Sequence, residues 1–142
     1  FALCFSSEEK KFYLIRQFRP FYFVRKLKYK FELVGGLVDK GESITQALKR
    51  EIKEEIGVRT LKLKRLTRYC PVPGYSDEIV NVYYAEVEKI KKSYLYNKFE
   101  NEEIKVSKLT LDQLKKINSS EQIQNVLTKV SIYEYLNKIK KS

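Results

Sequence analysis

Three glutamates within five residues are the first feature of this sequence that could carry chemistry. Glu51, Glu54 and Glu55 lie three or four positions apart, which is the spacing of neighbours on one helix face. We therefore expect their carboxylates to converge. Hard divalent cations such as Mg²⁺ prefer oxygen ligands, so the cluster is a candidate metal site. The alternative is a solvated acidic face, partly neutralised by Lys49 and Lys53.

A glycine loop and an amphipathic helix are needed to position these glutamates. Ser43 is a candidate N-cap, and Gly57 stands where a left-handed C-cap is expected. Apolar residues recur at the helical period, at Ile44, Ala47, Leu48 and Ile52. The pattern predicts a helix over residues 43–56 that buries this face and leaves the acidic face to solvent or metal.

The spacing across residues 36–58 resembles the Nudix box. Gly36 is followed after five residues by Glu42, and after seven more by the run Arg50-Glu51-Ile52-x-Glu54-Glu55-x-Gly57-Val58. No position of the box is missing. Members of that family hydrolyse a nucleoside diphosphate linked to another group, and metals neutralise the phosphate charge and activate water.

The resemblance implies a role for each residue of the box. Glu51 and Glu55 correspond to metal ligands, Glu54 to a catalytic residue at the same metal cluster, and the Gly35 carbonyl to a further ligand. Arg50 corresponds to the ion-pair partner that holds the glutamates in place and is counted with the catalytic residues. Mg²⁺ is the expected cofactor, with Mn²⁺ as an alternative.

Three flanking segments resemble the ADP-ribose pyrophosphatase branch of the family. They are Arg16-Gln17-Phe18-Arg19 with Glu32-Leu33 before the box, Pro73–Glu78 after it, and the acidic run Glu100–Val106. Val34-Gly35 departs from the Pro-Ala that this branch usually has, and this departure changes the packing beside the substrate pocket.

The same resemblance implies residues that meet the substrate and the attacking water. Arg19 would contact a phosphate or the distal ribose, and Asp77 and Glu78 would border the pocket. One of Glu100 and Glu102 would position or deprotonate the water. The alternatives are a surface charge at position 19 and plain turn residues at the others. The chain has no histidine, so a general base must be a carboxylate, a lysine or water activated by metal.

Length and composition favour a single globular domain over residues 1–142. No apolar run is long enough to cross a bilayer, so we expect no membrane partner. The chain begins at Phe1 and contains no Met, so we expect a missing native N-terminus. Two cysteines, Cys4 and Cys70, do not make a disulfide framework, which favours reduced thiols and a cytoplasmic protein, with one bridge as the alternative.

The net charge of +11 is unevenly distributed. Residues 1–30 carry 8 Lys/Arg against 2 Asp/Glu and residues 89–142 carry 12 against 6, whereas residues 36–58 carry 4 against 5. An acidic site in a basic body would attract a polyanionic substrate. RNA binding is an alternative, and so is a lysine-rich surface that only aids solubility.

The remaining pattern predicts an α/β fold, a Nudix-type α/β/α sandwich with a mixed β-sheet. The expected strands cover residues 1–6, 11–19, 31–34, 59–69, 79–87 and 104–106, with a polar loop at 89–101. Further helices are expected from the capping box at Thr110–Gln113 and from Ser119–Gln122. The aromatic, basic residues 21–30 fit a strand edge or a loop that packs its rings better than a nucleic-acid surface.

We therefore expect metal-dependent hydrolysis of the pyrophosphate bond of ADP-ribose or a related nucleoside diphosphate sugar. The products would be AMP, or another nucleoside monophosphate, and a sugar phosphate. The alternatives are an RNA 5′-pyrophosphohydrolase or nucleotide housecleaning enzyme, and a non-catalytic nucleotide-sugar-binding module. By resemblance to the branch we also expect a homodimer, with the stretch Phe21–Phe31 as part of its interface.

Overall fold

The chain is built around one mixed β-sheet. The computed structural model describes residues 1–28, 30–91, 94–97 and 102–140. Its strands within these ranges have the order β3-β4-β1-β2-β6-β5. β1 and β4 are parallel, and the other neighbouring pairs are antiparallel, so the predicted mixed sheet is confirmed. The strand bounds are β1 Ala2–Ser6, β2 Lys11–Arg16, β3 Thr60–Tyr69, β4 Val80–Val87, β5 Tyr94–Asn97 and β6 Glu102–Leu109.

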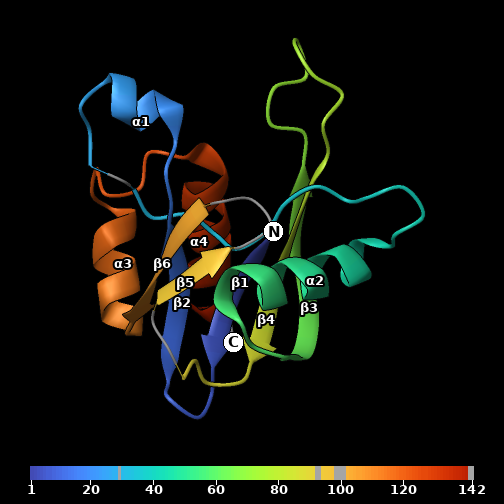
Figure 1. The fold of residues 1–142 in the computed structure, drawn as a ribbon, viewed down its shortest axis with the longest axis vertical. Coiled ribbons are helices and arrows are strands. Elements are labelled where there is room, and N and C mark those ends of the chain that lie inside the picture. The colour runs from blue at the N-terminus through green and yellow to red at the C-terminus, as the bar shows by residue number, and fades with distance from the viewer. Residues whose placement is uncertain (29, 92–93, 98–101, 141–142) are drawn as a thin grey trace.

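Helices cover both faces of this sheet, which confirms the α/β/α sandwich (Figure 1). Alternate side chains of a strand point to opposite faces. Ala2 and Cys4 therefore share one core with α2, whereas Leu3 shares the second core with α3 and α4. The helix bounds are α1 Pro20–Val24, α2 Ile44–Ile56, α3 Leu111–Asn118 and α4 Val126–Lys140. None of these helices has the length and apolarity needed to cross a bilayer.

The boundaries of α2 agree with the prediction. The Ser43 hydroxyl accepts a hydrogen bond from the Gln46 backbone nitrogen, and the Gln46 side chain accepts one from the Ser43 nitrogen, which forms a capping box. Gly57 ends the helix with φ of 70°, a left-handed conformation that favours glycine. Ile44 was expected in the buried face but is 38% exposed, because it lies in the first turn, beyond the edge of the core.

The interpretation of residues 21–30 as a strand edge or a loop was wrong for residues 21–24, which are helical, whereas residues 25–28 are turn and loop. Pro20 begins the short helix α1, since its fixed φ suits the first helical position, and the Arg19 carbonyl accepts hydrogen bonds from the nitrogens of Tyr22 and Phe23. The rings were expected to pack inward, yet Phe21 and Phe23 are exposed and only Tyr22 of this helix is buried. The preceding strand correspondingly ends at Arg16 and not at Arg19.

Three other segments differ from the prediction. The expected loop at 89–101 contains β5, which pairs with β6 through its backbone. Residues 31–34 form isolated bridges to β1 and β2 and no continuous strand. The last helix begins at Val126 because the Asn125 side chain accepts a hydrogen bond from the Thr128 nitrogen, while Ser120 closes the end of α3 through the Ile117 carbonyl.

Candidate active site

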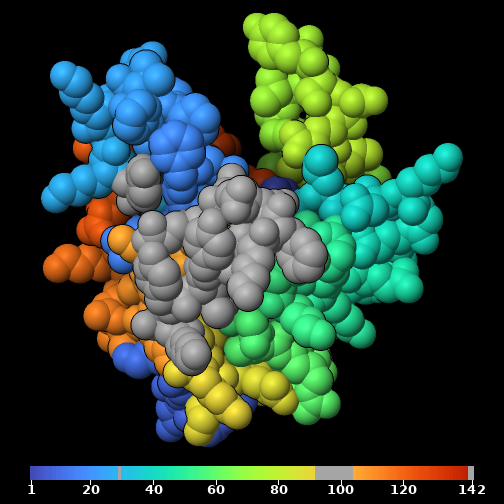
Figure 2. Space-filling model, in the orientation of Figure 1, coloured from blue at the N-terminus to red at the C-terminus, as the bar shows by residue number. Residues whose placement is uncertain are grey.

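A cleft of about 940 Å³ opens where the glycine loop, the start of α2 and the start of β4 meet. Its lining includes Arg19, Gly35, Glu51, Glu55 and Glu78. Figure 2 shows that the segment around residues 71–79 stands away from the body, with a notch between it and α1. Arg19 and Glu78 are 59 positions apart in the chain, and both line this cleft. The sequence analysis proposed each of them as a site residue from a different segment.

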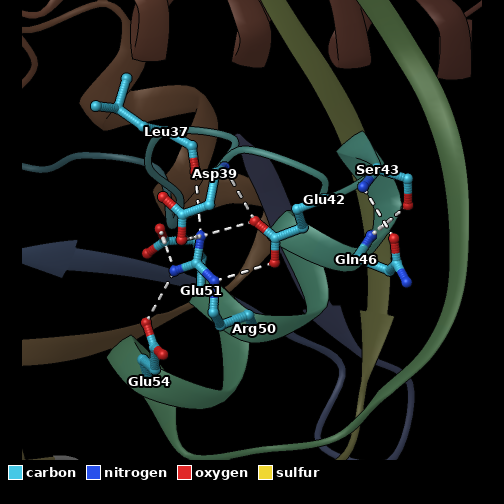
Figure 3. A network of polar contacts seen from close by, with 8 residues as sticks. All are labelled: Leu37, Asp39, Glu42, Ser43, Gln46, Arg50, Glu51 and Glu54. Atoms are coloured by element: carbon cyan, nitrogen blue, oxygen red, sulfur yellow. Dashed lines mark hydrogen bonds and ion pairs between the residues drawn. The ribbon is translucent and has the colours of Figure 1, made fainter.

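Arg50 links the glycine loop to the acidic face of α2 (Figure 3). Its Nη1 donates to Glu51 Oε1 at 2.9 Å and to Glu54 Oε2 at 3.1 Å. Its Nε and Nη2 donate to the two oxygens of Glu42, each at 3.1 Å, and Nη2 also donates to the Leu37 carbonyl. The guanidinium holds the pKa of Glu42 below its ordinary value. Asp39 pairs with the same guanidinium at 3.5 Å, so one planar cation links four carboxylates and the loop backbone.

Glu55 is buried against the same loop. Its Oε2 accepts a hydrogen bond from the Gly35 nitrogen at 2.8 Å. Burial raises the pKa of Glu55 to about 8, opposed by the Gly35 hydrogen bond and reinforced by the nearby charge of Glu51. The helical pattern assigned Glu55 to the open face, since periodicity cannot show that a loop folds over that face.

The expected convergence is found for the carboxylates of Glu51 and Glu54 and does not include Glu55. Among the described residues, no three Asp, Glu, Cys or His side chains lie together as a ready metal site. Arg50 draws Glu51 and Glu54 to its own Nη1, whereas Glu55 turns to the Gly35 nitrogen.

The donor chemistry nevertheless fits a hard divalent cation. Glu51 and Glu55 both line the cleft, and burial, reinforced by the charge of Glu51, makes it costly for Glu55 to be charged, which raises its pKa. A divalent cation would relieve that cost, and carboxylate and carbonyl oxygens suit it. The loop also approaches closely, since a Cβ at Gly36 would lie 2.4 Å from Glu51 Oε1. Glu51, Glu55 and the Gly35 carbonyl are thus the residues that would hold the ion.

The other expected site residues divide into three groups. Arg19 and Glu78 line the cleft, as the sequence interpretation requires, while Asp77 lies in the exposed loop before β4 and is not among the lining residues. Glu102 is the first residue of β6. Glu100 lies outside the described residues.

Two residues that contact Arg19 were not singled out as site residues from the sequence. Glu32 is buried and pairs with Arg19 at 2.8 Å, and the buried Gln17 donates to the same carboxylate. A charged residue inside the apolar run Phe31-Glu32-Leu33-Val34 was the available signal, because a buried acid needs a partner.

Comparisons with known proteins agree with this geometry. The family model described as the NUDIX domain matches residues 1–130. The ADP-ribose pyrophosphatase of Bacillus subtilis (strain 168) is 31% identical over 139 residues, which cover 95% of this chain and 70% of that protein. The methanol dehydrogenase activator of Bacillus methanolicus is 27% identical over 135 residues, with the same two coverages.

A solved structure has a similar fold. A crystal structure of an ADP compounds hydrolase superposes with a TM-score of 0.75 and 19% identity, over 99% of this chain and 72% of that one. The chain belongs to the Nudix family. It is a pyrophosphohydrolase, an enzyme that cleaves the pyrophosphate bond of nucleoside diphosphate compounds.

Proposed function

We propose that this enzyme hydrolyses ADP-ribose or a closely related nucleoside diphosphate sugar, with Mg²⁺ as its cofactor and Mn²⁺ as a substitute. The observation that carries the proposal is one cleft lined by Glu51, Glu55 and Arg19, in which the Gly35–Gly36 backbone lies against both carboxylates. The relative named for ADP-ribose supports the substrate class.

Each residue of the cleft would have a separate role in this hydrolysis. Arg19 would bind a phosphate oxygen and orient the diphosphate, since a guanidinium matches phosphate geometry. Arg50 keeps Glu51 in place through its Nη1. A divalent ion held by Glu51, Glu55 and the Gly35 carbonyl would neutralise the charge that makes a pyrophosphate a poor electrophile. Glu78 would border the sugar end of the substrate, and Glu100 or Glu102 would orient the attacking water.

A substrate panel tests this assignment. With Mg²⁺, ADP-ribose should yield AMP and ribose 5-phosphate faster than any nucleoside triphosphate or 5′-triphosphorylated RNA is cleaved. Preference for the triphosphates would favour an RNA 5′-pyrophosphohydrolase or housecleaning enzyme, which the net charge of +11 would suit. Binding of ADP-ribose with no metal-dependent turnover would favour a binding module.

We further propose a cytoplasmic homodimer. Cys4 is a buried free thiol and Cys70 an exposed one, which suits a reducing compartment. The exposed rings of Phe21 and Phe23 on α1 are candidates for the dimer contact, since aromatic side chains anchor interfaces. Light scattering at micromolar concentration would contradict this if it gave only the monomer mass.

A further inference from the structure

Glu32 is a buried carboxylate outside the glutamate-rich helix. Its side chain is 7% exposed, and its Oε2 accepts hydrogen bonds from Arg19 Nη2 at 2.8 Å and from Arg19 Nε at 3.2 Å. Gln17 Nε2 donates to the same oxygen at 3.4 Å. Contact through two nitrogens fixes the plane of a guanidinium as well as its distance.

The backbone holds both partners of this pair. Glu32 exchanges two backbone hydrogen bonds with Ile15 of β2, at 3.0 and 2.9 Å. The Arg19 carbonyl accepts hydrogen bonds from Tyr22 and Phe23 at the start of α1. The fold therefore places the two backbones so that the side chains can meet, and the side-chain contact with Glu32 orients the guanidinium.

The charge of Glu32 also bears on the cleft. Arg19 is 45% exposed and lines the cleft with Glu51 and Glu55. Its charge lowers the pKa of Glu55, while the charge of Glu32 raises it. An arginine without its own counter-ion would be attracted to the carboxylates of the cleft, where it would compete with a bound cation.

We propose that Glu32 is a positioning residue, which directs the Arg19 guanidinium at a phosphate of the substrate and keeps it away from Glu51 and Glu55. The proposal rests on the proposed function, because it assumes a diphosphate in this cleft. It adds a residue that lies outside the Nudix box and acts through Arg19 and not on the substrate.

The first experiment replaces Glu32 by glutamine, which keeps the shape and removes the charge. Glu32→Gln should raise KM for ADP-ribose about 10-fold, with a smaller change in kcat, because a charge-assisted contact in the bound ground state is weakened. The double variant Arg19→Ala with Glu32→Gln should have the KM of Arg19→Ala alone, since Glu32 acts through Arg19. Glu88→Gln is the matched control: Glu88 makes the same two-nitrogen contact with Arg59 in an exposed pair, and its KM should equal that of wild type.

A second measurement separates this proposal from the proposed function. Calorimetry with inorganic pyrophosphate and Mg²⁺ should give an affinity about 10-fold weaker for Glu32→Gln than for wild type. If wild type does not hydrolyse ADP-ribose, the substrate assignment fails, yet the pyrophosphate affinities still decide the role of Glu32. A Glu32→Gln protein with a lower Tm but wild-type KM and pyrophosphate affinity would overturn the proposal, because Glu32 would then only stabilise the fold.

Arg19→Lys keeps the test decisive if Glu32→Gln does not fold. Lysine retains the charge but cannot make the two-nitrogen contact with Glu32. Its KM for ADP-ribose, and its dissociation constant for pyrophosphate, should approach those of Arg19→Ala. Wild-type values in Arg19→Lys would show that the orientation imposed by Glu32 is not used.

Discussion

The carboxylate of Glu55 accepts a hydrogen bond from the backbone nitrogen of Gly35, 2.8 Å away. This contact joins the last turn of α2 to a loop that lies 20 residues earlier in the chain. With the Arg50 contacts to Leu37 and Glu42, it makes the glycine loop and the helix one rigid unit beside the cleft. Substitutions in the glycine loop should therefore shift the carboxylates of Glu51 and Glu55.

The first prediction concerns the pH dependence of stability in the metal-free protein. Burial raises the pKa of Glu55 from 4.5 to about 8, so the folded state holds this proton more tightly than the unfolded state. Its charging therefore costs folding free energy, and the cost grows as pH rises from about 4.5 to about 8. In EDTA, Glu55→Gln should gain Tm relative to wild type over that range. Parallel Tm curves from pH 5 to 8.5 would contradict the burial effect.

The second prediction compares two glycines of the loop. A Cβ at Gly36 would meet Glu51 Oε1 at 2.4 Å, so Gly36→Ala should displace this carboxylate and lower kcat by about 10-fold or more, with little change in Tm. Gly41 has φ of +83° and open space around its Cβ position. Gly41→Ala should therefore cost about 1 kcal/mol of stability and leave the kcat of the folded enzyme unchanged. Chemical denaturation and steady-state rates on both variants would show whether the two effects separate in this way.

The helix α2 was predictable because its caps and its apolar period are local signals. Ser43, Gln46 and Gly57 act within a few residues of one another, so no tertiary information was needed. The burial of Glu55 and the pairing of Glu32 with Arg19 depend on segments 13 to 20 residues apart. The periodicity of apolar residues describes only one helix or strand at a time, so it cannot predict these contacts. Similarly, α1 was missed because its exposed rings give no apolar face. β5 was missed although its partner β6 follows directly in the chain, because only four residues form it within a polar segment.

The third prediction concerns acid stability at the hairpin between β1 and β2. Glu9 accepts hydrogen bonds from Lys108 Nζ at 2.8 Å and from the Tyr13 hydroxyl, and these hold its pKa below the ordinary value. A depressed folded pKa stabilises the protein above the unfolded pKa, and that contribution is lost as pH falls through the folded pKa. Glu9→Gln should therefore have a lower Tm than wild type at neutral pH, and the difference should shrink on acidification.

Glu8→Gln is the control for this experiment. Glu8 neighbours Glu9 in sequence but pairs with Lys89 at the exposed surface, where an ion pair contributes little. Its Tm should follow that of wild type at every pH. A constant difference between Glu9→Gln and wild type from neutral to acid pH would show that the charge of Glu9 is not the cause.

The fourth prediction compares the loss of kcat when each of the three glutamates of α2 is replaced. Glu51 and Glu55 line the cleft, whereas Glu54 contacts Arg50 and is not among the lining residues. Glu51→Gln or Glu55→Gln should reduce kcat by about 100-fold or more, because each removes a proposed ligand of the divalent ion. Glu54→Gln should cost less, since it weakens only one contact of Arg50. Rates for the three variants, measured across Mg²⁺ concentrations, would contradict this order if Glu54→Gln were the most damaged.

The last prediction concerns the acidic segment that enters β6. It contains Glu100, outside the described residues, and Glu102, the first residue of that strand. A residue that orients the attacking water acts mainly in the transition state, so its removal should lower kcat by about 10²–10⁴-fold and leave KM nearly unchanged. Glu100→Gln and Glu102→Gln should therefore be measured separately, for kcat and for Mg²⁺ dependence.

A loss of kcat at normal Mg²⁺ dependence identifies the water-positioning residue, whereas a raised Mg²⁺ requirement identifies a ligand. Wild-type behaviour in both variants would show that this segment is only a turn, and that activation of the water depends on Glu51 and Glu55.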